Sequence, residues 1–290
     1  MEISASLVKE LREKTGAGMM DCKKALTECN GDMDAAVDYL REKGITKAAK
    51  KQDRIAAEGL SNIYIDGNKA VVIEVNSETD FVAKNDEFKE LINVIGNAIL
   101  NSGVTDLESA LNVNVDGTTI NDLIVNATAK IGEKISLRRF TLVTKNDDEV
   151  FGSYIHMGGK ISSLVVLNGS NEEVAKDVAM QAAAMRPLYA KISDVPTEDV
   201  EHEKNVIKEQ VINEGKKPEF ADKIVEGRIA KFFEETVLEQ QAFIKDSSLK
   251  VVDYISNNSC SLVSLTRYEV GEGMEKRNDN FAEEVMNQIK

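Results

Sequence analysis

The two histidines and three cysteines are the side chains of this sequence best suited to acid–base or nucleophilic chemistry. His202 lies in a charged helical pattern and is expected at the surface, while His156 precedes a glycine pair without a second catalytic group in the same motif. Cys22 and Cys29 are seven residues apart on an expected helix, which favours core packing, and Cys260 is isolated. These residues predict no catalytic group, no metal site and no cofactor.

Two glycine-containing segments have some features of phosphate-binding loops. In Gly158-Gly159-Lys160-Ile161-Ser162 the upstream glycine of such a loop is missing, because Tyr154 stands there. Gly271-Glu272-Gly273 is not followed by the third glycine of a dinucleotide-binding turn. We predict that both segments are simple turns, so the sequence offers binding surfaces and no catalytic constellation.

The segment Thr79-Asp80-Phe81-Val82 is the feature best suited to act on another molecule. It follows an apolar strand pattern and precedes a helical one, so a carboxylate and a phenyl ring are expected on a polar loop. A phenyl ring left in water forgoes about 2 kcal/mol of burial energy. Phe81 therefore either packs beneath its own helix or enters a pocket of another molecule, and the local sequence alone favours the first alternative.

Composition restricts the class of partner. The chain has 290 residues and a net charge of −14, and the acidic excess lies after residue 58. An acidic body repels phosphates, which disfavours direct nucleic-acid binding. The basic run Lys47, Lys50, Lys51 and Arg54 is either a solvated linker face or a contact with an acidic partner. The absence of a long apolar run and of a signal peptide, with the cysteine pattern, predicts a cytoplasmic protein without a membrane span.

The elements that must position these residues predict an α+β chain. Residues 4 to about 44 show three short helical patterns, in which Gly31 ends the second helix and Asp32 caps the third. A charged helical linker is expected over about 45–58. A strand–strand–helix–strand pattern then occurs twice, with strands expected at 60–65, 69–76 and 135–144, and at 150–156, 160–168 and 261–269. We predict two related subdomains, each a three-stranded antiparallel sheet backed by helices.

The second subdomain contains an insertion bounded by prolines. Residues 197–214 and 219–236 have helical patterns around a turn at Pro218, which predicts an antiparallel helical hairpin. The last residues, about 279–290, return to a helical pattern. The expected domains are residues 1–54, 55–145, 146–278 with the hairpin inserted at about 197–236, and 279–290.

Several segments, in order along nearly the whole chain, resemble the elongation factor Ts family. The strongest are Thr15–Leu26 and Thr79–Lys84, supported by Lys130–Glu133, Gly152–His156, Val225–Arg228 and Tyr268–Gly273. The resemblance implies a ubiquitin-associated-like N-terminal bundle, a two-subdomain core, a coiled-coil hairpin and a C-terminal helical module. It also implies a guanine-nucleotide exchange factor of translation that binds the GTPase elongation factor Tu and is not an enzyme.

The resemblance further implies which residues touch the partner. It assigns Thr79, Asp80, Phe81 and Val82 to displacement of Mg²⁺ from elongation factor Tu, with Phe81 as a wedge between helices. It assigns further contacts to the bundle, the second subdomain and the C-terminal helix: Lys9, Arg12, Met19, Met20, His156, Met157, Gly158, Phe281, Val285 and Met286. Core packing of Met19 or Met20 is an alternative, and the turn at Met157 departs from the family pattern. For the whole chain, the alternative function is a non-catalytic adaptor or chaperone-like interaction protein.

Overall fold

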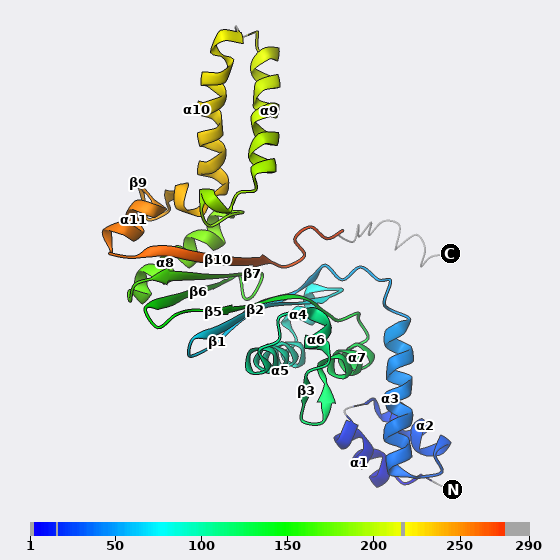
Figure 1. The fold of residues 1–290 in the computed structure, drawn as a ribbon. Helices are drawn as coiled ribbons and strands as arrows, with labels where there is room; N and C mark the ends of the chain where they lie inside the picture. The colour runs from blue at the N-terminus through cyan, green and yellow to red at the C-terminus, as the bar shows by residue number, and fades with distance from the viewer. Residues whose placement is uncertain (1–2, 16, 216–217, 276–290) are drawn as a thin grey trace. The chain divides into compact units, whose positions relative to one another are not determined.

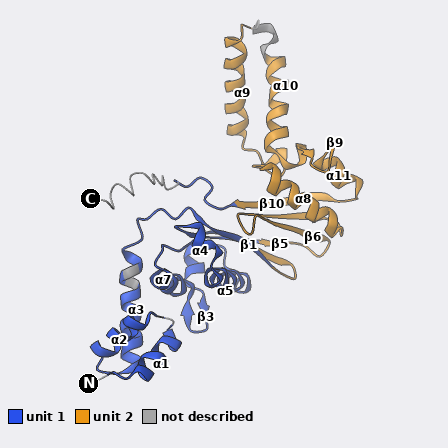
Figure 2. Cartoon of the chain, turned by 180° about the vertical axis from the view of Figure 1, so that it is seen from behind, with its two compact units in different colours: residues 1–64, 73–142, 269–290 blue, residues 65–72, 143–268 orange. Residues whose placement is uncertain are grey.

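The computed structural model describes residues 3–15, 17–215 and 218–275. The helix expected over 279–290, with Phe281, Val285 and Met286, therefore lies outside the described residues. The chain divides into two compact units, residues 1–64, 73–142 and 269–290 and residues 65–72 and 143–268 (Figure 2). Helices and antiparallel strands occur together in the chain, which confirms the α+β prediction.

The N-terminal bundle consists of α1 (Ala5–Thr15), α2 (Met19–Glu28) and α3 (Met33–Ala49). As expected, Gly31 adopts a positive φ of 85° and the Asp32 carboxylate caps α3 by accepting the Ala35 N–H at 2.9 Å. The bundle's fully buried residues are Leu11, Cys22, Ala25, Leu26 and Ala36. The third helix continues to Ala49, where it packs along α7 (Ile120–Ile131). The helical linker expected over about 45–58 is therefore only partly correct, since residues 50–57 form turns and irregular chain before β1.

The first sheet has the strand order β1-β2-β5, with β1 (Glu58–Asp66), β2 (Lys69–Ser77) and β5 (Ser136–Thr144). The central strand β2 is buried from Ala70 to Ser77, including the polar residues Glu74, Asn76 and Ser77. Between β2 and β5 the chain forms α4 (Asp80–Lys84), α5 (Asp86–Ser102), α6 (Leu107–Leu111), β3 (Asn114–Val115), β4 (Thr118–Thr119) and α7. The small elements α6, β3 and β4 were not expected from the sequence.

The second sheet repeats this arrangement in the order β10-β7-β6, with β6 (Glu149–His156), β7 (Ile161–Asn168) and β10 (Ser261–Glu269). In both sheets the second strand of the first hairpin lies in the centre, and β6 pairs antiparallel with β7. Helix α8 (Glu172–Met185) packs on β6 and β7, and Gly152 permits this approach, since a Cβ there would lie 2.0 Å from the Ala175 carbonyl oxygen. The remaining elements of this region are η1 (Ile192–Asp194), η2 (Leu238–Gln240), β8 (Ala242–Phe243), β9 (Asp246–Lys250) and α11 (Val251–Asn257).

The inserted hairpin consists of α9 (Thr197–Asn213) and α10 (Pro218–Thr236), and it extends away from the β10-β7-β6 sheet (Figure 1). Its helices pack through Ile207, Val211, Val225 and Ile229, as an antiparallel pair requires. At its base, the buried Gln241 amide donates to the carbonyl oxygens of Met185 and Glu235, both at 3.1 Å. The hairpin prediction is confirmed.

Candidate functional site

Phe81 projects from one turn of helix and not from the loop that the sequence predicted. Thr79 caps α4, because its Oγ1 accepts the Val82 N–H at 3.4 Å. The Phe81 side chain is 78% exposed, so it does not pack beneath its own helix in the free protein. The structure excludes the first of the two sequence-based alternatives, since the phenyl ring points into solvent.

The other residues of α4 anchor this turn. Val82 and Ala83 are 8% and 3% exposed, so they pack inward and hold the helix to the protein. Asp80 accepts a hydrogen bond from Lys84 at 2.6 Å, and the Lys84 ammonium lies 5.8 Å from the centre of the Phe81 ring. The exposed surface of α4 therefore consists of a phenyl ring beside a carboxylate–ammonium pair. Val82, which the resemblance grouped with the partner contacts, is buried.

Glu133 binds the residue that begins α4. Its carboxylate accepts the Thr79 N–H at 3.0 Å and the Thr79 hydroxyl at 2.7 Å. Glu133 directly follows Gly132, whose φ of 88° ends α7. The sequence marked both Thr79–Lys84 and Lys130–Glu133 as family-like, but no local pattern indicated that the two segments touch. A threonine and a glutamate 54 positions apart leave no such signal.

A second carboxylate joins the same two parts of the chain, but here the acceptor lies beside Thr79 and the donor beside Glu133. Glu78, whose side chain is 8% exposed, accepts the Lys134 N–H at 2.6 Å and pairs with Arg54 at 3.2 Å. Lys51 donates to the Gly132 carbonyl oxygen at 2.6 Å. Two members of the basic run 47–54 are therefore used inside the protein, to hold the connection after α3 against the end of α7.

The candidate residues of the bundle lie at its surface. Met19 and Met20, in the first turn of α2, are 57% and 76% exposed, which excludes the alternative of core packing. Lys9 and Arg12 are exposed on α1, and Lys9 lies 3.7 Å from Glu13. Exposed methionines suit a docking surface because their side chains adapt to a partner's shape.

The turn between β6 and β7 presents His156, Met157 and Gly158. Met157 is 72% exposed and adopts a left-handed φ of 50°, followed by Gly158 at 64°. His156 Nδ1 lies 3.3 Å from the Tyr154 hydroxyl, and the two rings stack with centres 5.8 Å apart. These residues belong to the second unit, whereas Phe81 and the bundle residues belong to the first.

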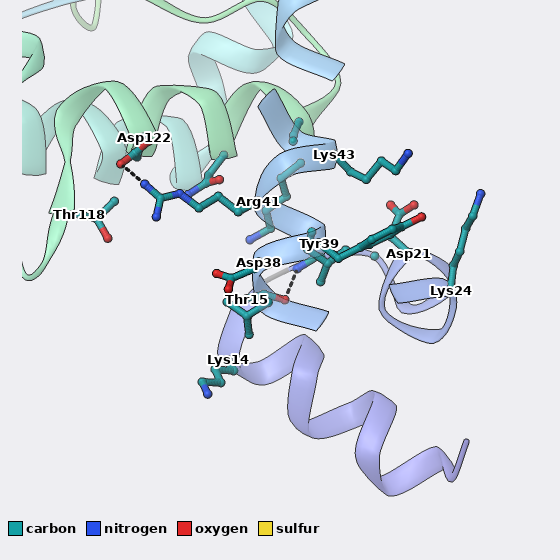
Figure 3. A pocket seen from close by; sticks show the side chains of 18 residues that line it. Lys14, Thr15, Asp21, Lys24, Asp38, Tyr39, Arg41, Lys43, Thr118 and Asp122 are labelled. Atoms are coloured by element: carbon teal, nitrogen blue, oxygen red, sulfur yellow. Dashed lines mark hydrogen bonds and ion pairs between the residues drawn. The ribbon is translucent and has the colours of Figure 1, made fainter. Parts of the chain in front are cut away.

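A polar cavity of about 550 Å³ lies between the α1–α2 turn, α3 and α7 (Figure 3). Arg41 reaches from α3 across to Asp122, at 2.8 Å, so the charged groups of the cavity partly neutralise one another. None of the predicted site residues lines this cavity. Within the described ranges, no group of three or more His, Cys, Asp or Glu side chains is placed to hold a metal ion. None of the helices described is both long and apolar enough to cross a bilayer.

The chain matches a model of a protein family. The family described as Elongation factor TS matches residues 78–272. The match covers more than half of the 290 residues. It begins at Glu78, the residue before the Thr79 cap, and ends in the segment that follows β10.

Proposed function

Because this chain belongs to the elongation factor Ts family, whose role is in translation elongation, we propose that it binds elongation factor Tu·GDP and accelerates the release of GDP and its exchange for GTP. The observation that supports this proposal most is the exposed Phe81 on a buried, capped turn of helix. An aromatic side chain held in a fixed, exposed position can serve as an anchor that enters a pocket of another protein. In this proposal, α4 enters the partner close to its nucleotide site and displaces Mg²⁺.

The proposed mechanism needs no covalent chemistry. Mg²⁺ and the phosphate-binding loop together hold GDP, so moving a helix that positions the metal's ligands weakens both. If this protein and GDP each weaken the binding of the other, they do so by the same factor. Full burial of Phe81 in a pocket would supply about 2 kcal/mol, which corresponds to about 30-fold in an equilibrium constant. Asp80 would add electrostatic repulsion against groups that ligate the metal.

The remaining contacts are proposed with separate roles. Lys9, Arg12, Met19 and Met20 would dock the bundle on the GTPase, and the turn at His156, Met157 and Gly158 would add a contact from the second unit. Phe281, Val285 and Met286 would contribute a C-terminal contact. We propose that Val82 acts as the buried anchor of Phe81 and not as a contact, because its side chain faces inward.

The test is release of a fluorescent GDP from elongation factor Tu, followed by stopped flow. We expect the protein to accelerate release, and Phe81→Ala and Asp80→Ala to lower the maximal rate by about tenfold or more while weakening binary affinity less. Ile212→Ala is a matched control, since Ile212 is an exposed apolar residue of the hairpin. Binding without acceleration would favour the adaptor alternative. A Phe81→Ala variant as active as the unmodified protein would refute the wedge.

A further inference from the structure

Every backbone and side-chain polar atom of Thr79 is hydrogen-bonded within the protein. Its N–H and hydroxyl donate to Glu133, its Oγ1 accepts the Val82 N–H, and its carbonyl oxygen accepts the Ser77 hydroxyl at 2.9 Å. Thr79 directly precedes α4 and, with Glu78, connects it to β2, so its conformation sets the direction in which α4 leaves the sheet. Two of these four hydrogen bonds involve Glu133, so Glu133 does more than any other side chain to fix the conformation of Thr79.

Helix α4 has five residues and is too short to be stable by itself. Its order must come from tertiary contacts, namely the buried Val82 and Ala83 below it and the Thr79 cap at its start. The carboxylate of Glu133 fixes the cap at two atoms, and Glu78 returns the contact by accepting the Lys134 N–H. The two segments are thus joined by a reciprocal pair of carboxylate-to-backbone bonds.

We propose that Glu133 is a positioning residue for Phe81, which holds α4 in the conformation that engages the partner. This inference rests on the proposed exchange function. In this proposal Glu133 acts through Thr79 and not by direct contact with the partner. Without it, α4 would have to be ordered when the complex forms, and part of the binding energy of Phe81 would be lost to that ordering.

Three substitutions separate positioning from charge. Glu133→Gln keeps the length and one acceptor for the Thr79 N–H but removes the charge. Glu133→Asp keeps the charge but is shorter by one methylene and cannot reach both atoms of Thr79. Glu133→Ala removes both the charge and the hydrogen-bond acceptors. If positioning is the role, maximal GDP release should fall about tenfold for Ala and Asp, and Gln should stay within about threefold of the unmodified protein.

The dependence on protein concentration excludes a general loss of folded protein. A smaller folded fraction raises the concentration needed for half-maximal release but leaves the maximal rate unchanged. Loss of positioning lowers the maximal rate, because α4 acts after docking. Glu108→Ala, which removes an exposed carboxylate of α6, should change neither quantity.

A second measurement needs no partner. In the free protein, amide hydrogen exchange at Thr79 and Val82 should be about tenfold faster in Glu133→Asp and Glu133→Ala, with α5 unchanged. Unchanged exchange at these amides would overturn the inference, and so would full release activity in both variants. If the Asp variant kept the maximal rate of GDP release and the Gln variant lost it, the role of Glu133 would lie in its charge and not in positioning. If the unmodified protein did not accelerate GDP release, the proposed function would be wrong. The amide hydrogen-exchange measurement would still show whether Glu133 orders α4.

Discussion

Replacing Glu74 by Ala should destabilise the first unit strongly, because this carboxylate is fully buried and multiply bonded. It accepts from Arg138 at 2.9 Å, from Arg139 at 2.6 Å and from the Gly271 N–H at 2.9 Å. It thereby connects the central strand β2 with β5 and with the segment after β10. The Asn76 side-chain amide also donates to it, at 3.1 Å. Removing Glu74 would leave two guanidinium groups, one side-chain amide and one backbone N–H without this acceptor.

The magnitude follows from the burial of the partners. Removing one member of a fully buried pair costs about 3–5 kcal/mol. The side chains of Arg138 and Arg139 keep 22% and 29% exposure, so water would satisfy part of their hydrogen-bonding capacity. The Arg139 guanidinium also donates to the Glu269 carbonyl oxygen at 3.1 Å. We therefore expect Glu74→Ala to lower the free energy of unfolding by about 3 kcal/mol, at the lower end of that range.

Urea denaturation at pH 7 measures this change, with Glu108→Ala as the control for loss of an exposed carboxylate. The slope of unfolding free energy against urea should stay the same, since the change removes an interaction and not a folded region. A loss below about 1 kcal/mol, the upper value for an exposed ion pair, would refute the reasoning that burial makes this network strong.

The same carboxylate predicts a dependence on pH. Burial, the largest single influence, raises the pKa of Glu74, but the hydrogen bonds from Gly271, Arg138 and Arg139 together hold that pKa below its usual value of 4.5. A carboxyl whose pKa is lower in the folded state stabilises the protein above its unfolded pKa and loses that contribution as the pH falls. Unfolding free energy should therefore drop below about pH 4.5 more steeply in the unmodified protein than in Glu74→Gln. Parallel curves for the two proteins would contradict this assignment.

Three further outcomes follow from the structure. Gly96→Ala should lower the free energy of unfolding by about 1–3 kcal/mol, because the new Cβ would lie 2.1 Å from the Tyr64 ring; a stabilised variant in thermal denaturation would show that helix propensity outweighs this overlap. Phe81→Ala should change the same quantity by less than about 0.5 kcal/mol, since its ring is mostly exposed and forfeits little burial; a larger loss in urea denaturation would show that the ring supports the fold. Replacing residues 201–232 by a short Gly/Ser linker keeps the base of the hairpin and should leave most GDP release intact; loss of release in the stopped-flow assay would assign the hairpin a direct part in exchange.

The sequence predicted the elements that depend on local pattern. Strand β10 begins and ends where expected, and Asp32 caps α3 as its position indicated. The sequence predicts a loop at α4, which is wrong, because five residues carry too little periodicity to indicate a helix. Its helical state is imposed by the Thr79 cap and by burial of Val82, and burial of a single turn is a tertiary property.

The part of the site that sequence reasoning could not reach consists of carboxylates that accept backbone N–H groups from distant segments. Glu133 accepts from Thr79, and Glu78 accepts from Lys134. In composition alone such residues count toward the acidic excess and are assigned to the surface. Both instead accept hydrogen bonds from the backbone at partly buried positions, and a charge-assisted bond is about twice as strong as a neutral one. An exposed Phe81 can therefore stay ordered without a partner, because the helical turn that carries it is fixed at Thr79 by Glu133 and by the buried Val82 and Ala83.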